Sequence, residues 1–361
     1  MNSSKSVSHS PLQKDGKGEG QGRRDWPAKA VWLLVALVVL SCVLLLLGAA
    51  VGSTGFESLA NMRGDVQALL IVWDIRLPRT VGAWLAGGLL GLAGAVAQGL
   101  FRNPLADPYL LGSASGASLG VAIFMVLFGV SPLAAQWALQ LGLTGAAFVG
   151  AVAAVLLTLL LANGVQHTLR LLLAGVVVGV VLGALTSLIL LVNPAVMQAM
   201  QAFMLGSTAF IGWTACLSMA LALLVCLISA WMMSHVLDGL ALGEATAQSL
   251  GLQLPQMRAA LVAVLALATG TAVAQTGLIA FVGLAAPHLV RSVVKTMHGW
   301  LIVLSSLTGA VLLVAADISA RWLVAPQELP LGVLTAMLGG GYLLWLMHRH
   351  AHRQIGRGSA L

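Results

Sequence analysis

Hydrophobic residues occur in long uninterrupted runs, which short polar breaks separate. Ten runs can be marked, near residues 31–52, 80–101, 110–130, 141–163, 170–192, 213–234, 257–275, 278–294, 300–323 and 329–347. A helix needs about 20 apolar residues to cross the hydrocarbon layer of a bilayer. Because the runs are continuous rather than alternating, a membrane β-barrel is disfavoured. The pattern predicts an all-α, polytopic membrane protein of about ten transmembrane helices, of which the eighth is short.

Composition supports a membrane domain flanked by two polar tails. Hydrophobic residues make up 59% of the chain and charged residues only 8%, whereas soluble domains carry about 25% charged residues. Residues 1–30 are rich in Ser, Gly, Lys and Arg, so we predict a disordered basic tail there. The alternative is the start of a signal peptide, but the run at 31–52 is long enough to remain as a first span. The membrane domain would cover 31–348, and 349–361 would form a second basic tail.

Basic residues set the predicted orientation. With ten spans and a cytoplasmic N-terminus, the outer side holds only Arg63, Arg76, Arg79 and Arg321. All other basic residues then lie on the inner side, as the positive-inside rule requires. The reversed orientation would export most of them. We therefore predict that both termini are cytoplasmic and that the net charge of +7 reflects topology rather than binding of nucleic acid.

Glycines recur at a spacing of four residues in three of the runs. The ridges comprise Gly87 and Gly91; Gly112, Gly116 and Gly120; and Gly175, Gly179 and Gly183. Such ridges allow close approach of helices in a membrane. Packing within one chain is the favoured interpretation, and a subunit interface or the wall of a transport pathway is the alternative.

Residues for catalysis or metal binding are sparse. The sequence contains no G-x-x-x-x-G-K-[ST], H-E-x-x-H or G-x-S-x-G motif. We expect no metal site, because a basic flank explains the histidines near the C-terminus and His288 has no evident partner. We also expect no disulfide, because thiols in apolar runs usually pack as small hydrophobic groups. The histidines near the C-terminus are His348, His350 and His352, and the cysteines are Cys42, Cys216 and Cys226.

One polar segment between two runs is too short to span the membrane. Residues 237–256 read "LDGLALGEATAQSLGLQLPQ", in which Leu240, Glu244 and Ala247 recur at helical spacing and Gly251 offers a stop. We predict one or two short helices on the inner face. A simple loop with one helical turn is the alternative to an element that docks a cytoplasmic partner.

Seven motifs in order identify a family resemblance. They are "RLPRTVGAWLAGGLLGLAGAVAQGLFRNPLADPYLLGSASGA", "LLLAGVVVG", "LGSTAF", "LALGEATAQSLGL", "GLIAFVGLAAPHLVR", "GAVLLVAADISAR" and "ELPLGVLTAMLGG". In this order the chain resembles the FecCD family, the permease subunits of type II ABC importers for iron chelates, haem and vitamin B12. Two positions depart from the family pattern, with Phe203 in place of the usual Trp and Gly341 in place of the usual Pro.

The resemblance implies roles for three sets of residues. Coupling to a cytoplasmic ATPase falls to Leu240, Gly243, Glu244, Ala247, Leu250 and Gly251, with Glu244 meeting a basic residue of the ATPase. Docking of a periplasmic binding protein falls to Arg76, Arg79 and Arg321, since Arg pairs well with carboxylates. The alternative is that these arginines satisfy helix ends or pair with Asp74, Asp317 or Glu328. An inner turn between the second and third spans falls to Asn103, Pro104, Asp107 and Pro108, residues that favour turns.

The resemblance therefore implies a homodimeric permease in the bacterial inner membrane, surrounded by lipid. The chain would be no enzyme and would bind no cofactor, because a separate ATPase uses ATP and Mg. The expected cargo is an iron chelate, either a siderophore or haem, with vitamin B12 as the alternative. A secondary carrier is a rival that would need buried ionisable groups on its pathway. An intramembrane enzyme and an importer of zinc or manganese are further rivals.

Overall fold

A computed structural model describes residues 25–52, 55–56, 66–129, 137–162, 164 and 168–358. Its first half contains α1 (Asp25–Ala50), β1 (Val51–Gly52), β2 (Gly55–Phe56), α2 (Val66–Ile71), the π-helical turn η2 (Val72–Arg76), α3 (Leu77–Leu100), the 3₁₀ turn η3 (Pro108–Leu111), α4 (Ser113–Phe128), α5 (Trp137–Leu161) and α6 (Thr168–Val192). Its second half contains α7 (Pro194–Leu205), α8 (Trp213–Met232), α9 (Ser234–Ala241), α10 (Glu244–Ser249), α11 (Leu254–Thr276), α12 (Val282–Val293), α13 (His298–Trp322) and α14 (Leu331–Gly358).

The predicted all-α membrane fold is confirmed, and each of the ten apolar runs coincides with a helix. Among the described residues, 7 helical stretches are long and apolar enough to cross a membrane, while α4 and the apolar part of α14 are shorter. The eighth run forms only the 12-residue α12, which is about 18 Å long at 1.5 Å per residue. This helix is too short to span, so the structure does not show ten full-length spans.

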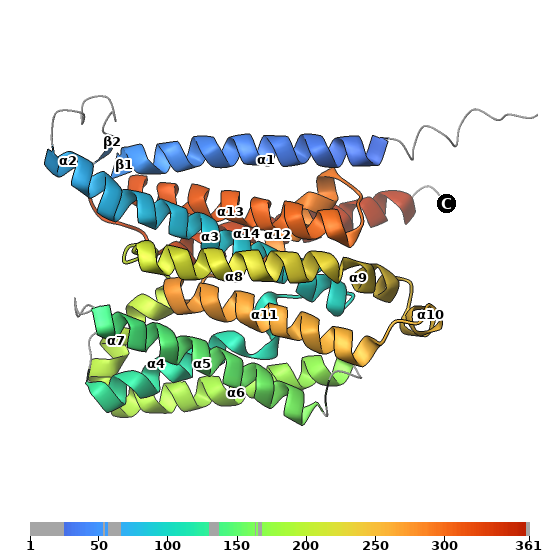
Figure 1. The fold of residues 1–361 in the computed structure, drawn as a ribbon, viewed down its shortest axis with the longest axis horizontal. Helices are drawn as coiled ribbons and strands as arrows, with labels where there is room; N and C mark the ends of the chain where they lie inside the picture. The colour runs from blue at the N-terminus through green and yellow to red at the C-terminus, as the bar shows by residue number, and fades with distance from the viewer. Residues whose placement is uncertain are drawn as a thin grey trace, which may run out of the picture.

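The long helices lie side by side with their axes roughly aligned (Figure 1). The elements α2, α7 and the small β1–β2 hairpin gather at one end of this array, here called the α7 end. The opposite end carries α9 and α10, together with the start of α1 and the end of α14, and is here called the α10 end. The two ends of the described chain therefore lie on the same side of the array.

Helix α3 forms the centre of the fold. It is buried along nearly its whole length and packs most extensively against α13, with α8, α11 and α12 also in contact. Glycines make the close approach possible, because a Cβ on Gly87 or Gly91 would overlap backbone carbonyl groups of α13. By contrast, α1 and α6 are mostly exposed, so they lie at the edges of the array.

Three features differ from the sequence-based expectation. Helix α7 was not among the predicted elements. Residues 25–30, which we assigned to a disordered tail, form the first turns of α1, and residues 349–358 continue α14 rather than forming a separate tail. The remaining parts of the two predicted tails, 1–24 and 359–361, lie outside the described residues.

Candidate functional site

Helices α9 and α10 stand beyond the ends of α8 and α11 (Figure 1). Gly243 separates them with a φ of 108°, a conformation that glycine adopts without strain. Gly251 ends α10 with a φ of 82°, and the next residue, Leu252, donates its backbone N–H to Ala247 O at 3.3 Å. This arrangement closes the helix in the manner of a Schellman motif. The predicted short helices are confirmed, and there are two of them.

The predicted coupling residues fall into buried and exposed groups. Leu240 and Ala247 are both 0% exposed and belong to the core, so they hold the two helices in place. Leu250 is 64% exposed, and so is the neighbouring Leu242 at 68%. The helical spacing did not single out Leu242, because that residue lies on the face opposite to the buried stripe. Both leucines lie at the ends of the short helices α9 and α10 and leave apolar surface accessible there.

Glu244, the first residue of α10, forms ion pairs within its own chain. Its Oε1 lies 2.7 Å from Arg258 Nη2 and 3.3 Å from Arg102 Nη2. Arg258 belongs to the first turns of α11, and Arg102 lies two residues beyond the end of α3. The partners of Glu244 that the structure shows are therefore internal, whereas the basic residue expected from the sequence would belong to another subunit.

A second ion pair anchors α9 to α13. Asp238 Oδ1 accepts hydrogen bonds from the backbone N–H of His298 at 3.0 Å and from its ring Nδ1 at 2.7 Å. Partial burial opposes ionisation of Asp238, but the hydrogen bonds from His298 outweigh it and lower the pKa of the carboxyl group. The carboxylate therefore fixes α9 to the N-terminus of α13, where a negative charge is also favoured by the helix dipole.

The polar stretch after α3 forms a turn and then re-enters the helix array. Asn103 Oδ1 accepts a hydrogen bond from Leu105 N at 2.9 Å, and Asp107 Oδ1 accepts one from Tyr109 N at 2.8 Å. Burial raises the pKa of Asp107, and the bond from Tyr109 opposes this shift. These contacts are typical of turn-forming side chains.

The sequence predicted a turn along this whole stretch, but only its first half is exposed. Asn103 and Pro104 are exposed, whereas Pro108 is buried and lies where a Cβ on Gly283 of α12 would meet it. The hydroxyl of Tyr109 donates to Ile279 O at 3.1 Å. The 3₁₀ turn η3 lies within this buried part and leads through Gly112 into α4.

A buried cluster of charges lies at the α7 end. Asp317 is 0% exposed, and its Oδ1 accepts from Arg79 Nε at 3.2 Å and from Thr208 Oγ1 at 2.5 Å. Its Oδ2 accepts from Arg321 Nη2 at 2.6 Å. Arg79 Nη1 also donates to Glu328 Oε1 at 2.9 Å. Buried charges need partners of this kind because desolvation is costly.

Arg321 also holds the end of α1. Its Nη1 donates to Gly48 O at 3.0 Å and to Val51 O at 2.9 Å, carbonyl groups that the end of a helix leaves without a helical partner. Its Nη2 lies 3.3 Å from Thr80 Oγ1. Arg321 is 1% exposed and Arg76 is 8% exposed. Internal pairing, one of the two alternatives for these arginines, is what the structure shows for Arg79 and Arg321.

Comparisons with known proteins agree along most of the chain. The sequence profile of the FecCD transport family matches residues 33–349. The chain is 37% identical over 331 residues to the hemin transport system permease protein HmuU of Yersinia pestis, which covers 90% of this chain and 96% of that protein. It is 39% identical over 322 residues to the vitamin B12 import system permease protein BtuC of Salmonella typhimurium, with coverage of 89% and 95%.

The chain belongs to the FecCD transport family. It is accordingly a multi-pass permease of the ABC importer type, not a catalytic subunit. A solved chain from a transporter described as of the metal-chelate ABC type, in an inward-facing conformation, superposes with a TM-score of 0.74 at 29% identity, covering 90% of this permease and 99% of that chain. PsaBC from Streptococcus pneumoniae shares the fold, with a TM-score of 0.54 at 17% identity.

The glycine ridges of the permease serve close packing at most positions. A Cβ on Gly116 or Gly120 would overlap carbonyl oxygens of α5, and one on Gly175 would overlap Leu110 O. Gly112 has a φ of 81° and precedes α4, where a left-handed residue is needed. Gly179 has only distant neighbours, and a Cβ on Gly183 would meet open space. The part of the α6 ridge at Gly179 and Gly183 is therefore loosely packed within the chain.

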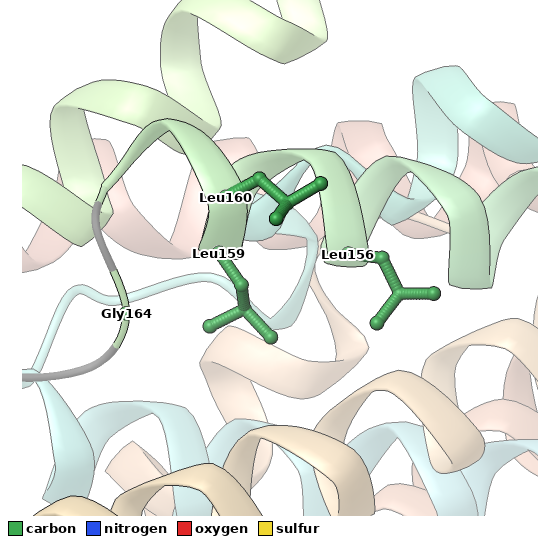
Figure 2. A pocket seen from close by; sticks show the side chains of 4 residues that line it. All are labelled: Leu156, Leu159, Leu160 and Gly164. Atoms are coloured by element: carbon green, nitrogen blue, oxygen red, sulfur yellow. The ribbon is translucent and has the colours of Figure 1, made fainter.

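Cavities within one copy of the permease are small or open. A recess of about 620 Å³ at the end of α5 is lined by Leu156, Leu159, Leu160 and Gly164 (Figure 2). The described residues that line it have apolar side chains or none. A second space, of about 210 Å³, lies between α12, α13 and α14. The ring of Tyr342 reaches this space and packs edge-on against His288, with 5.8 Å between ring centroids.

Proposed function

We propose that this permease moves a bulky metal chelate across the bacterial inner membrane, with an iron chelate (siderophore or haem) as the cargo. A substrate-binding protein would deliver the cargo at the α7 end, which faces the periplasm. Separate ATPase subunits would bind at the α10 end, which faces the cytoplasm together with both termini. ATP and Mg would be used by those subunits, and the permease itself would bind no cofactor.

The observation that carries this proposal is the geometry of α9 and α10. The two helices project from the array (Figure 1), present the exposed side chains of Leu242 and Leu250, and are tied to α3, α11 and α13 by ion pairs. A projecting element that is anchored on several long helices can transmit rigid-body motion to them. Such an arrangement suits an external motor.

Cavity size supports a pathway between two copies of the permease. Pockets for drug-sized ligands typically measure about 300–1,000 Å³. The space between α12, α13 and α14 holds about 210 Å³, and the larger recesses described above and between α5, α8 and α11 open on the outside of the array. We therefore infer a homodimer whose central pathway is lined by helices of both copies.

The charge cluster at the α7 end supports docking of an acidic partner. Arg79 is shared between two carboxylates of different exposure, since Asp317 is 0% exposed while the side chain of Glu328 is 30% exposed. A carboxylate of the binding protein could replace Glu328 without disturbing Asp317. On this proposal Arg79 makes the contact, while Arg321 and Arg76 hold the surface in shape.

The named relatives support a metal chelate but divide over its identity. HmuU is named for hemin at 37% identity, and BtuC for vitamin B12 at 39%. Because the two identities are similar, vitamin B12 remains the alternative cargo. All three named systems, including the metal-chelate type transporter, concern a metal held inside an organic ligand.

Uptake in a strain that lacks this gene tests the cargo. Labelled ferric siderophore, iron-labelled haemin and labelled cobalamin would be supplied with and without the restored gene. We expect an iron label to return with the wild-type gene. The Leu250→Asp variant, expressed at the same level, should not restore uptake. Return of cobalamin alone would establish the alternative, and return of none of the three would contradict the proposal.

A further inference from the structure

The carboxylate of Glu244 lies at a junction of three segments. Its Oε1 contacts Arg258 at 2.7 Å and Arg102 at 3.3 Å. Through these contacts α10 is joined to α11 and to a residue two positions beyond the end of α3. Few other contacts hold α10, since Ala247 is its one buried residue. The ion pairs are therefore the main side-chain connection between α10 and the long helices.

Burial makes the two pairs unequal. The side chain of Arg258 is 4% exposed, whereas those of Glu244 and Arg102 are 35% and 42% exposed. Removing the carboxylate partner of a buried guanidinium strongly destabilises the folded protein, because the positive charge stays desolvated. An exposed pair such as Glu244–Arg102 contributes little. The connection from α10 to α11 is therefore the strong one, and the connection to Arg102 is secondary.

We propose that Glu244 is a positioning residue that transmits movement of α10 to α11 through Arg258, rather than a contact with the ATPase. This inference rests on the proposed function. Leu242 and Leu250, the large apolar side chains exposed at the ends of α9 and α10, face the ATPase instead. When the ATPase displaces α10, the pair between Glu244 and the buried Arg258 obliges α11 to follow, and the whole segment moves as one body. Without the carboxylate, α10 can shift while α11 stays in place.

The test uses the complete transporter, assembled from this permease, its ATPase and its binding protein in proteoliposomes. Labelled ferric siderophore, iron-labelled haemin and labelled cobalamin serve as probes, and the ratio of probe transported to ATP hydrolysed is measured. Co-purification of the ATPase is measured in parallel. We expect Glu244→Gln and Arg258→Gln to lower the ratio at least about fivefold, the lower limit of typical coupling between sites, with ATPase binding retained. Arg102→Gln should change it by about twofold or less.

Two controls and a double variant separate the possible roles. Lys295→Gln removes another exposed basic residue that the sequence places on the inner side and should leave the ratio unchanged. Leu250→Asp should lose the ATPase itself. Glu244→Gln/Arg258→Gln removes both members of the pair, so it avoids an uncompensated buried charge. Its ratio should match that of the single variants, because residues that act as one unit are not additive.

Two results would overturn the inference. The first is an unchanged ratio in Glu244→Gln or, if that variant does not assemble, in the double variant. The second is loss of ATPase binding in Glu244→Gln with normal binding and ratio in Arg258→Gln, which would make Glu244 a direct contact. Failure of the wild-type transporter to move any of the three probes would count against the proposed cargo and is distinguishable from both results.

Discussion

Removal of the carboxylate at the centre of the α7-end cluster is the sharpest test of what holds that end together. Asp317 is 0% exposed and accepts hydrogen bonds from Arg79, Arg321 and Thr208. In Asp317→Asn the two guanidinium groups lose their shared negative charge while staying buried. Breaking a buried ion pair by removing one partner costs about 3–5 kcal/mol.

The surroundings place the expected cost near the lower limit. Arg79 keeps Glu328 at 2.9 Å, and Arg321 keeps the carbonyl oxygens of Gly48 and Val51. We therefore expect the free energy of unfolding to fall by about 3 kcal/mol. Because each 1.4 kcal/mol is a factor of ten, this corresponds to about two orders of magnitude in the folding equilibrium.

Reversible unfolding of the purified permease in mixed detergent micelles would measure this difference. Glu328→Gln is the matched control, because it removes a carboxylate from the same cluster at a position that is 30% exposed. Its cost should stay below about 1 kcal/mol, as for exposed pairs. Equal losses in the two variants would refute the argument that burial of Asp317 makes it the organising charge.

Three further predictions concern the remaining contacts. In Gly94→Ala a Cβ would overlap Gly283 O of α12, so the free energy of unfolding should fall by about 1–3 kcal/mol in the same assay. A Cβ in the control Gly183→Ala would meet open space, so this variant should be neutral or stabilising. Equal effects of the two substitutions would contradict the role of close packing at Gly94. The pKa of Asp238 is lowered from 3.8 in the folded protein, so its carboxylate should make the wild type more stable than Asp238→Asn above about pH 4. This advantage should be lost as the pH falls through the lower, folded-state pKa. A difference in thermal midpoint between the two proteins that stays constant from pH 7 to below this range would contradict the prediction. In Leu250→Asp the substituted side chain is exposed, so the free energy of unfolding should change by less than about 0.5 kcal/mol, while co-purification of the ATPase should be lost. Retained co-purification would show that Leu250 does not contact the ATPase.

The hydrophobic pattern alone predicted the fold class and the position of every long helix. Continuous apolar runs have one stable solution in a membrane, the helix, so their positions carry over directly to the structure. Lengths were harder to predict. The run at 278–294 was assigned to a span because hydropathy does not distinguish helix from irregular chain, yet its first residues, 278–281, precede the helix, and Phe281 has a φ of 68°.

Residue roles were predicted less completely, for a geometric reason. Helical spacing located the segment that became α9 and α10, and Gly243 and Gly251 occupy the breaks that their backbone angles require. The sequence could not show that Glu244 meets Arg258 and Arg102, because the members of these pairs lie far apart along the chain or across a turn. The same holds for Arg79, whose partner Asp317 is 238 residues away.

The central claim is that an external ATPase drives this permease through the α10 end. Accumulation of a labelled iron chelate, ferric siderophore or haemin, in proteoliposomes that contain the complete transporter tests it most directly, with ATP or a non-hydrolysable analogue supplied on the side of the ATPase. The account predicts accumulation with ATP, none with the analogue, and none with ATP when Leu250→Asp replaces the wild-type permease. Accumulation that follows an imposed ion gradient without ATP would contradict it and would make the chain a secondary carrier.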